Sequence, residues 1–471
     1  MRLLILVLAL LVYATGASAP TPPAGEDPIR LERFEKEIDD LRNRLRIPGL
    51  SAVIVEDQKV LWAKGYGFAD LENQIPATPD TLYHIASLTK TFAATMILRL
   101  VEQGKLDLDE PISHYSSDFK DDSVRIKHLL SHTSHGTPGE RFQYDGSNFD
   151  YLTVVIEKQT GKPFLNVVVE TFFDPLGMSD SVPYHNVVND ADRWVASLGK
   201  DHLDRYRQNL TRLAQPYTYY GAGETVHSSY PPEDSFSGAA GLLSTVRDMA
   251  KYDIAIDRHV FLNKETQERA WTPFVSNGGA RLPYGLGWFV TDWHGVKLVW
   301  HYGHWGTGFS AMYLKIPERN ISIIMLVNSE ALADHGVEDV ANNAFVCSFL
   351  DLWGYAYDCE RDSQAVLAKW VEQRRAKGRV AIPVHPDILE SYVGQYQFEA
   401  LDNRIYTITR DGNRLIFHVP KGPKMELFAE SESKFFLKIR PYQLVFTKAE
   451  GLPPQLEIVE GDETFHSKRI N

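Results

Sequence analysis

A serine and a lysine stand three residues apart in Ser87-Leu88-Thr89-Lys90, at the start of a long apolar stretch. If this stretch is a helix, the hydroxyl and the amine share one face, and the lysine can take the proton of the serine. Burial of the amine and the positive end of the helix dipole both disfavour its ammonium form. The pattern predicts that Ser87 is a nucleophile activated by Lys90. The alternative is that Ser87 only caps the helix.

The S-x-x-K pattern alone is weak, because about two matches are expected by chance in a chain of this length. Two others occur, at residues 197–200 and 431–434. The later match lies in a charged, solvated stretch where the amine stays protonated, and the earlier one contains Gly199 and continues into an acidic segment. Lys90 alone belongs to an apolar helix, so Ser87 is the serine that we expect to react.

The elements around this serine indicate a domain that mixes helices and strands. Residues 87–101 predict a helix that is apolar around most of its circumference and ends near Gly104, so it is expected to be buried. An amphipathic helix is expected at residues 31–45. The β-rich runs lie at both ends of the domain, at residues 50–55, 60–63, 296–300, 311–315 and 321–327. The prediction is an α/β or α+β fold.

The C-terminal part of the chain has a different character. Residues 362–377 predict a last amphipathic helix, and residues 379–387 predict an extended linker. From residue 388 to residue 471, short β runs follow one another closely, with a hairpin signal at 410–413. We therefore expect a larger domain at residues 28–378 and a small antiparallel β-barrel or sandwich at residues 388–471.

Composition limits the partners. The chain has 471 residues, with 49 Lys and Arg against 62 Asp and Glu, and a formal net charge of −13. An acidic chain without a basic run argues against nucleic acid or an anionic membrane surface as partner. The 16 histidines form no zinc motif such as H-E-x-x-H, and no G-x-S-x-G elbow occurs. No metal and no organic cofactor is expected.

The first residues predict export. Residues 1–19 combine a positive start, an apolar run too short to span a bilayer, and an Ala-Ser-Ala cleavage site, which is typical of a signal peptide. No later run is long and apolar enough for a transmembrane segment, so we expect a secreted or periplasmic protein. Cys347 and Cys359 are candidates for one disulfide, and the alternative is two buried thiols.

Several segments, in order, resemble one known family. They are Ile85–Phe92, Leu129–Ser134, Pro138–Tyr144, Gly241–Thr245 with Asp248, Tyr284–Trp288 and His301–Gly303. Over about residues 30 to 372 the sequence resembles the serine β-lactamase and penicillin-binding protein superfamily, in its class C-like branch, which also holds family VIII carboxylesterases and D-amino-acid-specific peptidases. The resemblance implies a β-lactamase/DD-peptidase-like domain, in which helices and a helical subdomain flank an antiparallel sheet.

The second motif of that family is Tyr-x-Asn, and Tyr144-Asp145-Gly146 occupies its place. The resemblance makes Tyr144 a catalytic residue, and a nearby lysine ammonium is expected to lower the pKa of its phenol. The alternative is an interior tyrosine with a bonded hydroxyl. The family's Asn helps to hold the acyl side chain of the substrate, so Gly146 argues against efficient β-lactam turnover. Asn148 is a candidate substitute in substrate binding.

The third motif is His-x-Gly in the class C-like hydrolases, and His301-Tyr302-Gly303 matches it. The resemblance makes His301 a further catalytic residue, with its imidazole beside the nucleophile and with Gly303 giving substrate close access to the backbone. The N–H groups of Ser87 and His304 are then the two oxyanion donors, and Trp305 is a candidate wall of the pocket. An alternative register is His304-Trp305-Gly306. A second alternative is that the histidine only makes structural hydrogen bonds at the end of a strand.

The C-terminal segment resembles the lipocalin-like β-barrel that some peptidases of this superfamily carry, through Ser391–Tyr396 and Phe435-Phe436. Its role is left open among covering the active-site mouth, oligomerisation and binding of an apolar ligand.

The sequence therefore predicts a secreted serine hydrolase that acts through an acyl-enzyme on esters, peptides, peptidoglycan-like or β-lactam-like substrates. The alternative is an inactive, penicillin-binding-protein-like binding or scaffold protein.

Overall fold

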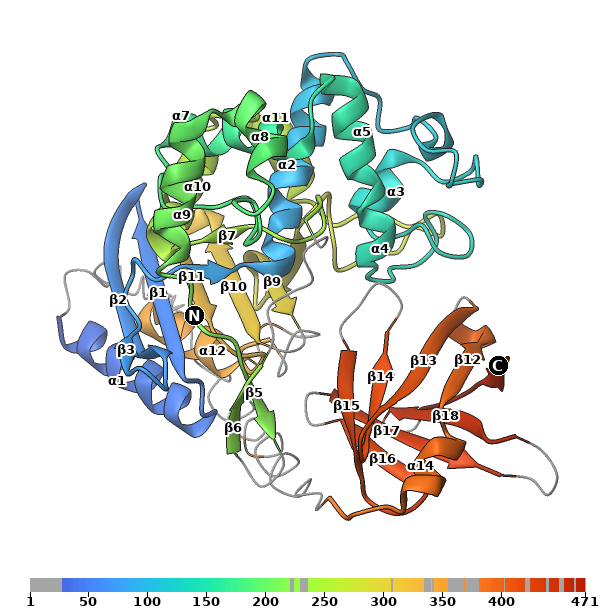
Figure 1. Ribbon diagram of the computed structural model, residues 1–471. Helices are drawn as coiled ribbons and strands as arrows, with labels where there is room; N and C mark the ends of the chain where they lie inside the picture. The colour runs from blue at the N-terminus through green and yellow to red at the C-terminus, as the bar shows by residue number, and fades with distance from the viewer. Residues whose placement is uncertain are drawn as a thin grey trace, which may run out of the picture.

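The computed structural model describes most of the chain from Pro28 onward. The described residues are 28–220, 224–228, 236–305, 308–333, 340, 343–354, 368, 381–401, 403–419, 424–437, 440–448, 453–460 and 463–470. They form an N-terminal domain of helices and strands and a C-terminal domain of short strands (Figure 1).

The described strands of the N-terminal domain form a seven-stranded antiparallel sheet in the order β3-β2-β1-β11-β10-β9-β8. The N-terminal hairpin joins the later strands through β1 and β11, where Leu50 lies opposite Val327. This pairing brings together the two ends of the domain, where the sequence predicted β-rich runs. The strands are β1 (Gly49–Glu56), β2 (Lys59–Asp70), β3 (Ile75–Pro76), β8 (Phe289–Trp293), β9 (Val296–Trp305), β10 (Phe309–Ile316) and β11 (Ile321–Val327).

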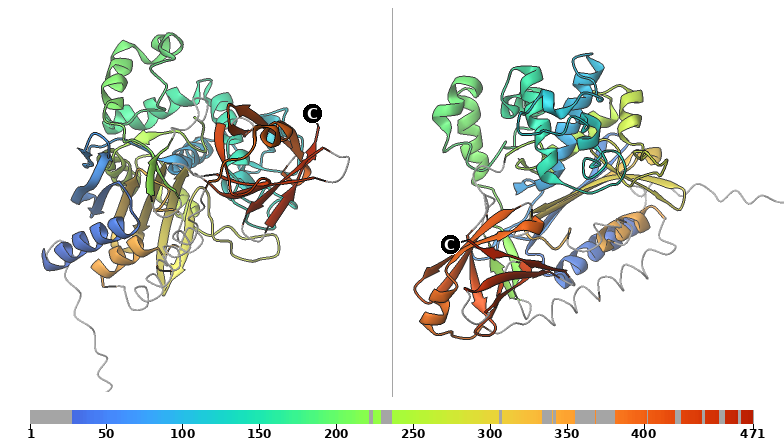
Figure 2. Two further views of the ribbon diagram at one scale, coloured as in Figure 1. Left: turned by 60° about the horizontal axis from the view of Figure 1, so that its bottom comes forward. Right: turned by 90° about the vertical axis from the view of Figure 1, so that its right-hand side faces the viewer.

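The sheet separates two hydrophobic cores, because successive side chains of a strand point to opposite faces. In β1, Val53 and Val55 belong to the core under α2, whereas Ala52 and Ile54 belong to the core under α1 and α12. Figure 2 shows α1 and α12 side by side on one face and the larger helical layer on the other.

The helical layer surrounds α2, which is buried over nearly its whole length, as expected from its sequence. The described helices are α1 (Pro28–Arg44), α2 (Thr89–Glu102), α3 (Ile126–Leu130), α4 (Gly146–Phe149), α5 (Tyr151–Thr160), α6 (Phe164–Val168), α7 (Asp174–Leu176), α8 (Ala191–Leu198), α9 (Lys200–Leu210), α10 (Val246–Asp257), α11 (Lys264–Ala270), α12 (Ala344–Leu352) and α14 (Pro386–Ser391). Two short pairs complete this domain, β4 (Tyr83–His84) with β7 (Leu243–Ser244), and β5 (Tyr217–Tyr220) with β6 (Glu224–His227).

The C-terminal strands form a nine-stranded antiparallel sheet that closes almost into a barrel. The start of β18 meets the last residues of the chain, where Ser467 N–H donates to Leu456 O at 3.0 Å and Arg469 N–H donates to Gln455 Oε1 at 3.1 Å. The strands are β12 (Gly394–Phe398), β13 (Arg404–Asp411), β14 (Arg414–His418), β15 (Lys424–Ala429), β16 (Lys434–Leu437), β17 (Arg440–Thr447), β18 (Gln455–Glu460), β19 (Glu463–His466) and β20 (Lys468–Arg469).

Several expectations fall wholly or partly outside the described residues. They are the leader at residues 1–19, nearly all of the helix expected at 362–377, and the first part of the linker expected at 379–387, which ends within α14. Cys347 is disulfide-bonded, whereas Cys359 lies outside the described residues. Among the described residues, no helix is both long and apolar enough to cross a bilayer.

Candidate active site

Ser87 lies in a tight turn between β4 and α2. Residues 86–88 form one 3-10 turn, and α2 begins at Thr89. Ala86 has a φ of 47°, in the left-handed region that residues with a Cβ rarely adopt. The turn leaves Ser87 half-buried, and its backbone N–H has no acceptor among the described residues. This N–H is therefore available to a negatively charged oxygen.

The hydroxyl of Ser87 is paired with the predicted lysine. Lys90 Nζ lies 3.1 Å from Ser87 Oγ and donates to the carbonyl of Ala239 at 2.9 Å. Burial lowers the pKa of Lys90 to about 7, against the opposing effects of Asp150 and Asp145. A large fraction of the amine is therefore neutral at neutral pH and can accept the proton of Ser87. The hydroxyl makes no helix-capping bond.

The two other S-x-x-K matches have no such environment. Lys200 is exposed and pairs with Asp204. Lys434 is exposed, and the hydroxyl of Ser431 accepts its backbone N–H at 3.0 Å. Both amines are exposed to solvent, so neither has the buried surroundings of Lys90.

Tyr144 completes the group, but as a neutral phenol. Its ring lies 5.2 Å from Lys90 Nζ. Its hydroxyl oxygen is buried and has no partner in good hydrogen-bond geometry among the described residues. Burial raises the pKa of Tyr144 well above 10, and the nearby Ser87 lowers it less. The expected lowering of the Tyr144 pKa by a lysine ammonium is therefore wrong for the resting site, because Lys90 has lost much of its charge to burial and Tyr144 keeps its proton.

The backbone on both sides of Tyr144 is fixed by His132. The N–H of Gln143 donates to the carbonyl of His132 at 2.8 Å, and the N–H of Asp145 donates to its Nδ1 at 3.1 Å. The imidazole also packs on the ring of Tyr144, with centroids 4.3 Å apart. His132 thus supports the loop on both sides of Tyr144.

His301 lies behind Tyr144, with both ring nitrogens engaged. Nδ1 lies 2.7 Å from the carbonyl of Tyr302, and Nε2 lies 2.8 Å from the hydroxyl of Tyr284. Since a carbonyl only accepts, Nδ1 carries the proton and Nε2 accepts from Tyr284. Burial, with a contribution from Lys90, lowers the pKa of His301 to about 3. In the resting site the imidazole is therefore neutral and lies beside the ring of Tyr144. A catalytic role for His301, which the family resemblance implies, stays a prediction.

Gly303 allows β9 to lie close to the nucleophile turn, because a Cβ at this position would lie 2.3 Å from the carbonyl oxygen of Ile85. This fit supports the His301-Tyr302-Gly303 register; Gly306, which the other register needs, lies outside the described residues. The expected role of Gly303 in giving substrate access to the backbone stays a prediction. His304 follows on the same strand and is exposed.

The remaining predicted residues line the same region. Trp305 is half-buried and packs against the ring of His84, with centroids 5.5 Å apart. Asn148 Nδ2 donates to Ser134 Oγ at 2.9 Å, so its amide is bound to the loop before Tyr144. A Cβ added at Gly146 would have Lys90 Nζ as its nearest atom, at 3.8 Å, so this glycine leaves room beside the amine.

The sequence reasoning missed the segment that holds Lys90 from the other side. Ala239 O binds Lys90 Nζ, Leu242 O accepts the N–H of Ile85 at 2.9 Å, and β7 pairs with β4. The Gly241–Thr245 motif marked this segment, but its contact with the lysine was not predictable from spacing.

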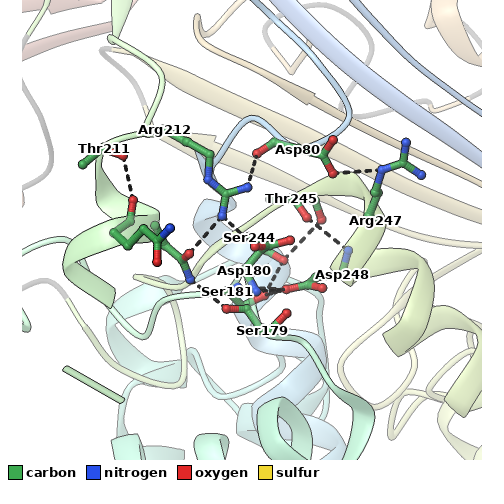
Figure 3. Close-up of polar contacts among 12 residues, drawn as sticks. Asp80, Ser179, Asp180, Ser181, Thr211, Arg212, Ser244, Thr245, Arg247 and Asp248 are labelled. Carbon is green, nitrogen blue, oxygen red and sulfur yellow. Dashed lines mark hydrogen bonds and ion pairs between the residues drawn. The ribbon is translucent and has the colours of Figure 1, made fainter. Parts of the chain in front are cut away.

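A buried carboxylate anchors the end of that segment (Figure 3). Asp248 Oδ2 accepts the N–H groups of Asp180 and Ser181, at 2.9 and 2.8 Å, and the hydroxyl of Ser181 at 2.9 Å. Ser181 Oγ also lies 2.9 Å from Ser244 Oγ in β7. The network thereby fixes β7, and through it β4 and the turn of Ser87.

In the described part of the chain, no group of three or more His, Cys, Asp or Glu side chains is arranged to hold a metal ion. The chemistry assembled at this site is that of a hydroxyl, an amine and a phenol.

A serine and a lysine at the start of a buried helix, packed against an antiparallel sheet with helices on both faces, define a protein of the serine β-lactamase and penicillin-binding type. The chain belongs to the Beta-lactamase family, whose model matches residues 34–347.

Its curated relatives include penicillin-binding proteins. It is 24% identical over 440 residues to penicillin-binding protein 4* of Bacillus subtilis (strain 168), covering 85% of this chain and 90% of that one. It is 26% identical over 324 residues to protein flp of Staphylococcus aureus (strain MW2), covering 60% of each chain.

Solved structures show the same fold. The octameric penicillin-binding protein homologue from Pyrococcus abyssi matches with a TM-score of 0.58 and 22% identity, over 93% of this chain and all of that one. D-amino acid amidase from Ochrobactrum anthropi SV3 matches with a TM-score of 0.50 and 22% identity, over 64% of this chain and 92% of that one. At these identities the likeness concerns the fold alone.

Proposed function

We propose that the protein is a secreted serine hydrolase that cleaves ester or amide bonds through an acyl-enzyme on Ser87. The observation that carries the proposal is the amine of Lys90, which is buried, 3.1 Å from Ser87 Oγ, and has its pKa lowered to about 7. Such an amine is poised to accept a proton at neutral pH. The family is typically one of serine hydrolases, and the signal-peptide pattern of residues 1–19 supports export.

In the proposed reaction, Lys90 accepts the proton of Ser87 while Oγ attacks the carbonyl carbon of the substrate. The N–H of Ser87 stabilises the oxyanion of the tetrahedral intermediate, and the N–H of His304 is the second donor by family resemblance. The phenol of Tyr144 gives its proton to the leaving group and is reprotonated by the Lys90 ammonium. Water then attacks the ester, with the amine again as base, and restores free Ser87.

Small esters and peptides are the proposed substrates, with β-lactams less suited. Gly146 leaves space beside Lys90, and unlike the family's Asn it carries no side-chain amide to hold the acyl side chain of a β-lactam substrate. Membership of the Beta-lactamase family supports peptide or amide-type substrates. Efficient hydrolysis of cephalosporins by the purified protein would overturn this preference.

The test is intact-mass spectrometry of the mature protein after incubation with a fluorophosphonate and, separately, with a fluorescent penicillin. We expect a fluorophosphonate adduct that is absent from Ser87→Ala and still present in Ser197→Ala, which removes the serine of another S-x-x-K match. A penicillin adduct would move the substrate class towards the cell wall. If folded protein forms neither adduct, the binding-protein alternative, which the missing Asn favours, replaces the hydrolase.

A further inference from the structure

The turn that carries Ser87 contains a backbone conformation that needs support. Ala86 has a φ of 47°, and the residue is buried, so contact with water does not stabilise this conformation. A residue with a Cβ is penalised in this left-handed region, and such residues persist only where their surroundings hold them. Because Ala86 directly precedes Ser87, its conformation sets the direction of the Ser87 N–H and side chain.

The support comes from the side chain of His84. Its Nδ1 accepts the N–H of Ala86 at 3.0 Å. On the other side of the same residue, the carbonyl of Ala86 accepts the hydroxyl of Thr89 at 2.7 Å. Both polar backbone groups of Ala86 are therefore hydrogen-bonded. The bond to His84 fixes the peptide group between Ile85 and Ala86, just before the nucleophile.

The imidazole of His84 is itself held in one orientation. Its backbone lies in β4, where it pairs with Leu243 of β7. Its ring is 2% exposed and packs against Trp305 of β9 and Phe309 of β10, with centroids 5.5 and 6.0 Å away. Burial, and to a smaller extent His185, lowers the pKa of His84 to about 3. The ring is therefore neutral, and since an N–H can only donate, Nδ1 is the bare nitrogen.

We propose that His84 is a positioning residue for Ser87: by accepting the N–H of Ala86 it holds the left-handed turn that aims the N–H and hydroxyl of Ser87 at the acyl group. This inference rests on the function proposed above. His84 belongs to none of the catalytic motifs, and it acts through Ala86 rather than on the substrate.

The proposal predicts what a glycine at position 86 should do. Glycine adopts positive φ without a steric penalty, so a glycine at this position no longer needs the bond from His84. A defect caused by loss of that bond should therefore be rescued by Ala86→Gly. A defect caused by lost packing against Trp305 and Phe309 should not.

The test measures the second-order rate of Ser87 labelling by a fluorophosphonate, together with kcat and KM for a p-nitrophenyl ester. His84→Phe keeps a ring between Trp305 and Phe309 and removes the acceptor. We expect it to lower the labelling rate and kcat at least about tenfold, with KM changed less than about threefold. Adding Ala86→Gly should restore most of the rate, and Ala86→Gly alone shows what the glycine does by itself.

A second pair of variants keeps the test decisive if His84→Phe does not fold. Asn at position 84 can accept the N–H two residues ahead in an Asx turn, whereas the longer Gln cannot form that turn. We expect His84→Asn to label much faster than His84→Gln. Any of three results would overturn the role of His84. They are equal labelling rates for His84→Asn and His84→Gln, a wild-type labelling rate for His84→Phe, or a slow His84→Phe that Ala86→Gly does not rescue. Failure of the wild type to label would instead refute the proposed function.

Discussion

At the scale of single residues, the site depends on how burial treats three groups. It moves the amine of Lys90 towards neutrality, keeps the phenol of Tyr144 protonated, and keeps His301 neutral. The spacing of Ser87 and Lys90 was enough to predict their pairing. The protonation of Tyr144 was not predictable, because the sequence does not show how completely its hydroxyl is enclosed.

The pH dependence of acylation should follow Lys90. The amine accepts the proton of Ser87 only when it is unprotonated, so the rate should rise with pH, with a midpoint near the pKa of about 7, and level off above it. The fluorophosphonate labelling rate between pH 5 and 9 measures this profile. Lys90→Ala should lose at least about 10²-fold in rate, whereas Lys200→Ala, in a decoy match, should keep the wild-type profile. A rate independent of pH across this range would exclude Lys90 as the base.

Replacement of Tyr144 by Phe should separate activity from stability. We expect kcat for an ester to fall about 10²-fold or more, because the leaving group loses its proton donor. The thermal midpoint should not fall, since the hydroxyl is buried without a well-placed partner and its removal relieves desolvation. Steady-state kinetics and a thermal melt check the two halves. A variant that loses stability but keeps its kcat would show that Tyr144 is only a packed residue.

At the scale of elements, close packing of β9 on the nucleophile turn is the main constraint. A methyl group at Gly303 would collide with the carbonyl of Ile85, so Gly303→Ala must move the strand or the turn. We expect a loss of about 1–3 kcal/mol of unfolding free energy together with a clear drop in labelling rate. Gly278→Ala is the matched control, because its Cβ would make only ordinary contacts, the nearest at 3.6 Å. Urea unfolding compares the two, and equal stabilities would contradict the packing argument.

A buried ion pair joins α10 to the sheet. Lys315 Nζ in β10 lies 2.5 Å from Asp253 Oδ1 and 2.9 Å from Asp257 Oδ1, and Tyr313 donates to Asp253 at 2.6 Å. Lys315→Met should cost about 3–5 kcal/mol, because it leaves two carboxylates without their cation. Lys297→Met removes a more exposed pair with Glu268 and should cost less than about 1 kcal/mol. Urea denaturation of both variants tests the difference, and similar losses would refute it.

The sequence predicted the elements with strong periodicity and missed those whose state depends on their neighbours. The apolar run of α2 and the strands β10 and β11 were predictable. The strand β15, with the sequence Lys-Met-Glu-Leu-Phe-Ala, contains mostly good helix formers and becomes a strand through its pairing with β14 and β16. β8 was missed as well, and it forms by antiparallel pairing with β9.

At the scale of the whole molecule, the family was predictable because its motifs occur in order along the chain, and the two-part architecture was predictable from the change in sequence character after them. The precise neighbours of the site were not, because they are set by the long-range pairing of β4 with β7 and by the close approach of β9 to Ile85. The fold is that of the family, whereas the proposed hydrolase activity depends on the state of a few buried groups.

The most direct test of the account is to locate the fluorophosphonate adduct by tandem mass spectrometry of peptides from the labelled full-length mature protein. The account predicts one modified residue, Ser87, with labelling that declines as the pH falls below about 7, where Lys90 becomes protonated. An adduct on another serine, with Ser87 unmodified in folded protein, would contradict it.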